Sequence, residues 1–158
     1  MSRLSHLDES GRARMVDVSD KRVTVRVAKA EGFLACKAAT LEQVRSGTAP
    51  KGSVIETAEI AGIMAAKRTA ELVPLCHPLS LAKIDVRIEA DERLPGFRVF
   101  SEVAANAVTG VEMEALTAVA VASLTLFDML KSIDRSMVIG GIEVTSKTGG
   151  KSGDWHRG

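Results

Sequence analysis

The sequence predicts an α+β fold in which two long helices cover one face of an antiparallel sheet. Three observations support this prediction. Several segments alternate polar and apolar residues as strands with one buried side do, two long segments have helical composition, and a short turn joins the central strands directly. The order of these elements fits a split β-α-β-β-α-β arrangement.

The first strand is predicted over residues 22–28. Val23, Val25 and Val27 alternate there with arginine and threonine, so we expect the three valines to form the buried face.

Two helices are predicted next, a short one over 40–45 and a long one over 54–72. Ser53 and Glu56 have the spacing of a capping box, which favours a helix start at residue 54. Gly62 lies within the long helix at a cost of about 1 kcal/mol relative to alanine. A helix that accepts this cost often has another backbone close by.

A hairpin and a final strand complete the predicted sheet. Residues 83–90 alternate polar and apolar side chains, residues 91–96 have turn composition, and 97–104 form the returning strand. A last strand is predicted over 137–146.

The second long helix is predicted over 111–133. Between Glu114 and Asp128 it carries only apolar residues, serine and threonine. A helix that is uncharged on all sides is buried on most of them. One small domain cannot easily surround such a helix, so we expect another subunit to cover part of it.

Length and composition indicate one domain, 1–158, with flexible ends at 1–14 and 148–158. A net charge of +1 and 3% aromatic residues argue against a nucleic-acid binder. The longest uncharged stretch, Ala115–Phe127, is shorter than the roughly 20 residues of a membrane span. Two cysteines without a CxxC pattern and the lack of a signal peptide predict a cytoplasmic protein.

Carboxylates at both ends of the second long helix are candidates for acid–base chemistry. Asp128 and Lys131 lie three residues apart and hence on one face, either as an ordinary surface ion pair or as an acid–base pair. Glu112 either closes a capping box with Thr109 or contacts a ligand. Glu114 has no capping role, and it lies about 21 Å from Asp128 along the helix axis.

The segment Leu75-Cys76-His77 lies between two prolines and cannot continue a helix. Two soft ligands without a third nearby are a weak metal signal, so we expect no metal site. The tail Lys147–Gly153 lacks the glycine that a P-loop requires, but it can wrap phosphates or remain a solvated tail. Together the cations near glycines, prolines and helix ends are compatible with a local polyanion pocket: Arg26, Lys51, Lys67, Lys131, Lys147 and Lys151.

Six motifs occur along the chain: MVDV at 15–18, AGIMAAKRT at 61–69, PLCHPL at 74–79, TGVEMEALT at 109–117, DMLK at 128–131 and GGKSG at 149–153. In this order they resemble the MoaC family of molybdenum cofactor biosynthesis. The resemblance extends over nearly the whole chain, and the TGVEMEALT and PLCHPL stretches are its most specific parts.

The resemblance implies a ferredoxin-like subunit that assembles into dimers and then a homohexamer. It implies a lyase that converts 3′,8-cyclo-7,8-dihydroguanosine 5′-triphosphate, made from GTP by an upstream radical enzyme, to cyclic pyranopterin monophosphate with release of pyrophosphate. No cofactor is required for this step, and Mg²⁺ is a possible companion of the triphosphate.

Site residues follow from the same resemblance. Asp128, Lys131 and Lys51 are expected to be catalytic. The residues expected to bind the substrate are Leu75, Cys76, His77, Met113, Glu114 and Glu112, with Arg26, Lys67 and Lys147 on the triphosphate or sugar side. Because the two ends of the helix are too far apart to meet at one small centre, we expect a composite site at a dimer interface.

Three other interpretations remain open at this stage. The chain could be a non-catalytic nucleotide-binding member of the family, a metal-dependent hydrolase that uses His77 and Cys76, or an RNA binder. The intact catalytic positions argue against the first, and the low charge and few aromatic residues argue against the last.

Overall fold

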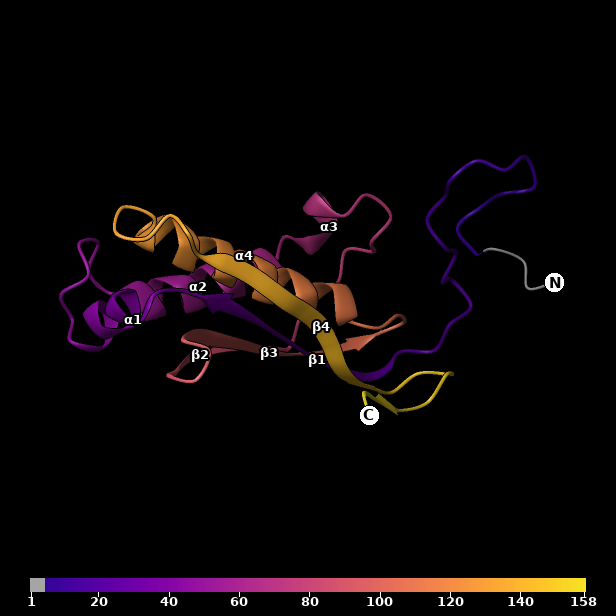
Figure 1. The fold of residues 1–158 in the computed structure, drawn as a ribbon. Coiled ribbons are helices and arrows are strands. Elements are labelled where there is room, and N and C mark those ends of the chain that lie inside the picture. The colour runs from indigo at the N-terminus through magenta and orange to yellow at the C-terminus, as the bar shows by residue number, and fades with distance from the viewer. Residues whose placement is uncertain (1–4) are drawn as a thin grey trace.

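An antiparallel five-stranded sheet forms one layer of the protein (Figure 1). The computed structural model describes residues 5–158. The strands lie in the order β2-β3-β1-β4-β5 and comprise β1 Thr24–Ala35, β2 Lys83–Asp91, β3 Gly96–Ala107, β4 Val138–Thr148 and β5 Trp155–His156.

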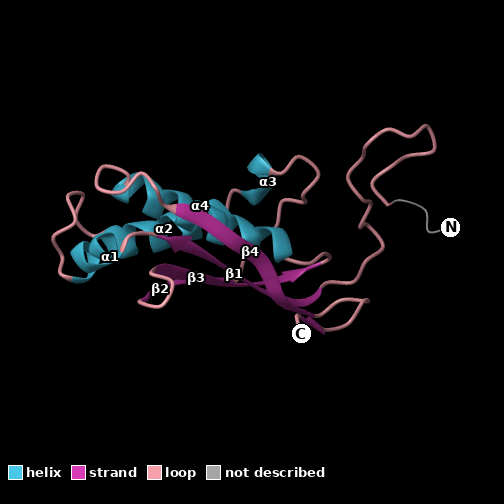
Figure 2. Cartoon of the chain, viewed as in Figure 1, coloured by secondary structure: helices cyan, strands magenta, loops and turns pink. Residues whose placement is uncertain are grey.

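Helices form the second layer, on one face of the sheet (Figure 2). Their bounds are α1 Ala38–Arg45, α2 Val54–Ala66, α3 Thr69–Leu72 and α4 Glu112–Leu130. The helix α4 packs on β1, β3 and β4, and α2 packs on α4 and β2. With α2 between β1 and β2, and α4 between β3 and β4, the predicted split β-α-β-β-α-β arrangement and its ferredoxin-like class are confirmed.

The core lies between these layers. Leu34, Phe97 and Val103 from the sheet and Val119 and Leu126 from α4 are all fully buried. Burial of such large side chains contributes about 1.5–3 kcal/mol each, so the contact between α4 and the sheet contributes substantially to stability.

The predicted buried face of the first strand is wrong. Val23 and Val25 are each 64% exposed, whereas Ala28, Ala30 and Leu34 face the core. Alternation shows that a strand has two faces but not which face is inside. Small residues occupy the middle of the core face of β1, where α4 lies close: a Cβ at Gly32 would lie 2.9 Å from the Val119 side chain.

The predicted helix over 54–72 is interrupted, since α2 ends at Ala66 and α3 begins at Thr69. The predicted capping box is also wrong: Ser53 occupies the N-cap position, but its side chain makes no capping hydrogen bond. The close backbone expected near Gly62 is confirmed, because a Cβ there would lie 2.8 Å from the carbonyl oxygen of Ala118 on α4.

The buried helix predicted over 111–133 corresponds to α4. Nine of its residues are buried, but Leu124 is 60% exposed, so one side faces outward. By length and hydropathy α4 could cross a membrane, and no other helix among residues 5–158 could. Half of its most apolar window is buried within the domain, which is typical of a core helix.

The C-terminal residues form part of the sheet edge. Trp155 and His156 in β5 pair with Lys147 and Ser146 of β4. The proposed flexibility of residues 148–158 and 1–14 stays a prediction, and residues 1–4 lie outside the described part of the chain.

Candidate active site

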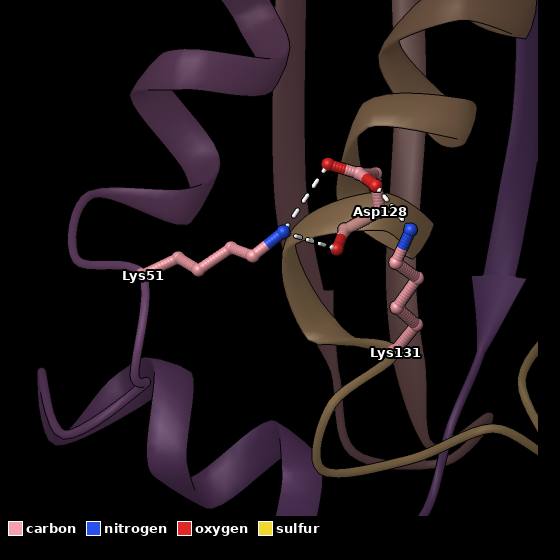
Figure 3. A network of polar contacts seen from close by, with 3 residues as sticks. All are labelled: Lys51, Asp128 and Lys131. Carbon is pink, nitrogen blue, oxygen red and sulfur yellow. Dashed lines mark hydrogen bonds and ion pairs between the residues drawn. The ribbon is translucent and has the colours of Figure 1, made fainter.

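Three of the predicted site residues meet at the C-terminal end of α4 (Figure 3). Asp128 lies in the last turn of α4, and Lys131 follows directly after the helix. The Lys131 Nζ lies 2.7 Å from Asp128 Oδ1. Lys51, from the loop between α1 and α2, donates to the Asp128 carbonyl oxygen at 3.0 Å and to Oδ2 at 3.3 Å.

The two ammonium groups determine the charge state of Asp128. Hydrogen bonds from Lys131 and then Lys51 lower the pKa of the Asp128 carboxyl, so it is ionised at neutral pH. All three side chains are about half exposed, with Lys51 at 44%, Asp128 at 58% and Lys131 at 54%. A carboxylate held between two cations and open to solvent can exchange protons with a bound substrate.

A pocket of about 560 Å³ opens beside this cluster. It is lined by Lys51 and Lys131 and by three residues to which the sequence reasoning gave no role: Phe127, Ser132 and Arg135. Arg135 is four residues from Lys131, and that spacing of two cations was the one available signal.

A second group of predicted residues lies at the N-terminal end of α4. Glu114 is only 2% exposed, and its Oε1 accepts a hydrogen bond from the Cys76 thiol at 3.7 Å. The Glu114 Oε2 atom is buried and has no hydrogen-bond partner among residues 5–158. Burial raises the pKa of the Glu114 carboxyl, and burial followed by the Glu114 charge raises the pKa of Cys76 to about 11. Burial thus disfavours the ionised form of both groups.

His77 contacts the N-terminal segment. Its Nε2 lies 2.7 Å from the carbonyl oxygen of Val16. Because a carbonyl oxygen can only accept, Nε2 is the donor, and a neutral His77 has Nδ1 as its acceptor nitrogen. Val16 belongs to the MVDV motif at 15–18, which by itself does not indicate a contact with His77.

A pocket of about 440 Å³ lies next to His77. His77 lines it together with residues on either side of it and around the start of α4: Leu75, Cys76, Thr109, Gly110, Glu112 and Met113. The N-terminal segment supplies the remaining wall through Ser5, His6, Val16, Val18 and Lys21. The predicted capping box between Thr109 and Glu112 is wrong. Val111 is the N-cap residue of α4, and its side chain makes no capping hydrogen bond.

Arg26 and Lys147 lie near the same end of the sheet. Arg26 donates from Nη2 to the Val108 carbonyl at 3.2 Å, and its Nε is buried without a partner. Gly150 has a φ of 85°, and a Cβ at this position would collide with the Arg26 guanidinium. The tail loop therefore packs on Arg26 only because residue 150 is glycine. Lys147 contacts the Ser152 hydroxyl.

A further pocket of about 550 Å³ is formed by Arg26 and the tail loop. Gly150, Lys151 and Ser152 line it, and so does Lys21, which also lines the pocket beside His77. Of the cations predicted to surround a polyanion, Arg26 and Lys151 are thus close to the Cys76–Glu114 group. Lys51 and Lys131 lie instead at the other end of α4.

Lys67 is placed by the direction of α2. Lys51, just before α2, contacts Asp128, and Gly62 approaches Ala118. The helix α2 therefore runs antiparallel to α4, and Lys67, the exposed residue directly after α2, lies toward the N-terminal end of α4.

The predicted residues consequently form two groups within one subunit. We call Lys51, Asp128 and Lys131 the C-terminal half-site, and the residues around Cys76, His77 and Glu114 the N-terminal half-site. About 21 Å of helix separates Glu114 from Asp128, so one subunit does not bring the groups together. Their catalytic and binding roles stay predictions.

The described side chains form no cluster of potential metal ligands. In the part of the chain that the structure describes, residues 5–158, no three side chains of His, Cys, Asp or Glu come together as a metal ion would require. Cys76 and His77 therefore have no third ligand within that range.

Known proteins resemble this chain over nearly its full length. The cyclic pyranopterin monophosphate synthase of Methylobacterium nodulans is 58% identical over 153 residues, which cover 97% of this chain and 96% of that protein. Proteins of the same name from Methylobacterium sp. and Nostoc sp. are each 56% identical, over 98% and 96% of this chain and 97% and 90% of their own lengths.

The family comparison agrees with these relatives. The model of the MoaC family matches residues 15–150, a range that includes both half-sites and the whole sheet except β5. The resemblance inferred from six motifs is therefore confirmed by a match that spans most of the sequence. This chain belongs to the MoaC family.

Proposed function

We propose that this chain is a cyclic pyranopterin monophosphate synthase, the name that its relatives carry. It would convert 3′,8-cyclo-7,8-dihydroguanosine 5′-triphosphate to cyclic pyranopterin monophosphate and pyrophosphate. The observation that carries the proposal is the Lys51–Asp128–Lys131 cluster, in which one ionised carboxylate contacts two ammonium groups beside a pocket.

The proposed reaction requires proton transfers that this cluster can carry out. Opening the purine ring and closing the new ring both move protons, and Asp128 and Lys131 can accept and return them. Formation of the cyclic phosphate breaks the bond between the α-phosphorus and the oxygen that leaves with pyrophosphate. Cations such as Arg26, Lys67 and Lys147 would stabilise the charge that develops on that oxygen.

We also propose that each active site is shared between two subunits. One subunit would provide the N-terminal half-site and its partner Asp128, Lys131 and Lys51. Two observations support this arrangement: the half-sites lie at opposite ends of α4, and large apolar side chains of α2 and α4 are exposed, with Ile60 at 58%, Met64 at 51% and Leu124 at 60%. We further propose that three such dimers assemble into a hexamer and that the protein acts in the cytoplasm. An upstream radical enzyme would supply its substrate.

No redox cofactor belongs to the proposed reaction. The rearrangement and the release of pyrophosphate exchange no electrons with an outside partner, so the reaction balances without one. Mg²⁺ can accompany the triphosphate as part of the substrate, bound through phosphate oxygens.

A direct assay tests the proposal. Purified protein is incubated with the cyclised GTP intermediate while pyrophosphate and the cyclic pterin product are followed. The Lys51→Ala and Asp128→Ala variants should lose turnover, whereas Lys83→Ala, which removes an exposed ion pair with Glu102 far from the cluster, should retain it. A folded wild-type oligomer that binds the intermediate without converting it would instead indicate a non-catalytic nucleotide-binding protein.

A further inference from the structure

We propose that Arg135 is a substrate-binding residue of the C-terminal half-site, where its guanidinium binds phosphate oxygens of the substrate. This inference deepens the proposed function and rests on it.

The position of Arg135 is the first argument. Its side chain is exposed and lines the same pocket of about 560 Å³ as Lys51, Lys131 and Ser132. Three cations and a hydroxyl group thus surround a space large enough for a phosphate group.

Charge is the second argument. Lys51 and Lys131 are both paired with the single carboxylate of Asp128. Within residues 5–158, Arg135 has no hydrogen bond or ion pair with any other side chain. Three cations and one carboxylate leave the cluster with an excess of positive charge, and Arg135 is the cation that none of the described side chains neutralises. An anionic ligand would neutralise it.

The anchoring of the loop is the third argument. The neighbouring Asp134 is 2% exposed and accepts hydrogen bonds from the Lys37 amide at 2.9 Å, the Thr40 hydroxyl at 3.1 Å, and the Ser136 amide and hydroxyl at 3.0 and 2.6 Å. These bonds tie the loop after α4 to the start of α1. The backbone of Arg135 therefore lies between two anchored residues, which lowers the cost of ordering its side chain around a ligand.

The chemistry of the guanidinium decides the role. Arginine stays protonated at any working pH, so Arg135 does not transfer protons as Lys131 can. Its planar group presents paired N–H donors that match two oxygens of a phosphate. Since the substrate carries three phosphates and the cluster beside Arg135 is the proposed reaction centre, we assign Arg135 to binding rather than to proton transfer.

Titration with inorganic pyrophosphate and steady-state kinetics test this assignment together. Calorimetry should show pyrophosphate binding to Arg135→Gln about ten-fold more weakly than to the wild type, as expected for the loss of one charge-assisted contact. The KM for the cyclised intermediate should rise by about the same factor, while kcat stays within about two-fold. Arg135→Lys should recover part of the affinity, because it restores the charge but not the fork.

Arg93→Gln is the matched control. Arg93 is an exposed arginine in the turn between β2 and β3, outside the pocket. If Arg135→Gln behaves like Arg93→Gln in both measurements, or if wild-type protein does not bind pyrophosphate, the assignment is wrong. Failure of the proposed function would look different: wild-type protein would not turn over the intermediate, whereas the pyrophosphate titrations would still decide the role of Arg135.

Discussion

The ammonium nitrogen of Lys51 lies 3.0 Å from the backbone carbonyl oxygen of Asp128 and 3.3 Å from its carboxylate Oδ2. These two residues are 77 positions apart in the chain. The loop between α1 and α2 thereby reaches the end of α4, and a lysine with no distinctive local pattern becomes the second cation on the carboxylate.

Replacement of Lys51 should remove activity without unfolding the protein. We expect Lys51→Met to lower kcat by about 10²-fold or more, because Asp128, which takes part in the proposed proton transfers, loses one of the two ammonium groups that contact its carboxylate. The exposed ion pair with Asp128 should contribute less than about 1 kcal/mol to the free energy of unfolding. Urea denaturation and the product assay measure the two effects, with Lys83→Met as control. A kcat within two-fold of wild type would remove Lys51 from the mechanism.

Mixed oligomers should reveal whether the site is shared. Subunits with Glu114→Ala and subunits with Asp128→Ala are each expected to be inactive alone. After random reassembly of equal amounts, about a quarter of the sites should contain two intact halves.

The control for this experiment combines two variants of the same half-site. Asp128→Ala mixed with Lys51→Ala should recover nothing, because every site then lacks one residue of the C-terminal half-site. Mass spectrometry establishes that mixed oligomers form. Inactive mixed oligomers of Glu114→Ala and Asp128→Ala would contradict the shared site.

Glu114 should make stability depend on pH. Burial raises the pKa of its carboxyl above the ordinary value of 4.5. Between that value and the raised pKa, the folded state binds more protons at this carboxyl than the unfolded state does. The stability that Glu114 contributes is therefore greatest below this window and falls as pH rises through it. We expect the Tm of the wild type to fall more than that of Glu114→Gln as pH rises from about 4.5 to neutral. Glu56→Gln, an exposed residue of α2, should follow the wild-type curve.

Asp134 should have the opposite pH dependence. Burial alone would raise the pKa of its carboxyl, but hydrogen bonds from Ser136, Lys37 and Thr40 outweigh burial and lower the pKa to about 2. The stability contributed by this carboxylate is therefore present above the ordinary value of 3.8 and is lost as pH falls toward about 2.

Removal of the Asp134 carboxylate tests this contribution. Asp134→Ala should lower the free energy of unfolding at neutral pH by about 2 kcal/mol, because buried donors lose their acceptor. It should also flatten the loss of stability in acid, which circular dichroism can follow. Asp154→Ala, at an exposed carboxylate that accepts one backbone hydrogen bond, should change stability little. Equal effects of the two substitutions would show that Asp134 is not a structural anchor.

Local patterns predicted the elements well but not every face or end. The hairpin β2–β3 and the long helix α4 follow directly from alternation and from an uncharged run. The buried face of β1 could not be read in the same way, because the valines alternate with arginine and threonine over residues 22–28, whereas the core residues Ala28, Ala30 and Leu34 lie mostly beyond that stretch. The close approach of α4 decides which side is inside, and that approach is a tertiary contact.

For the candidate site, too, the sequence predicted some residues and missed others. Motif order was enough to predict Asp128, Lys131, Cys76, His77 and Glu114 as site residues. It did not indicate Arg135, whose one sequence signal is its four-residue spacing from Lys131. Arg135 lines the pocket in a loop that Asp134 ties to the start of α1.

By itself, the sequence determined the ferredoxin-like arrangement and the family, because hydrophobic periodicity and motif order are properties of the chain alone. Only the tertiary structure decided which residues share a site. Lys51 meets Asp128, Cys76 meets Glu114 and Val16 meets His77 across separations of 38 to 77 residues, and these contacts depend on how the helices pack on the sheet. The same packing places the two half-sites at opposite ends of α4, where the length of a rigid helix keeps them apart.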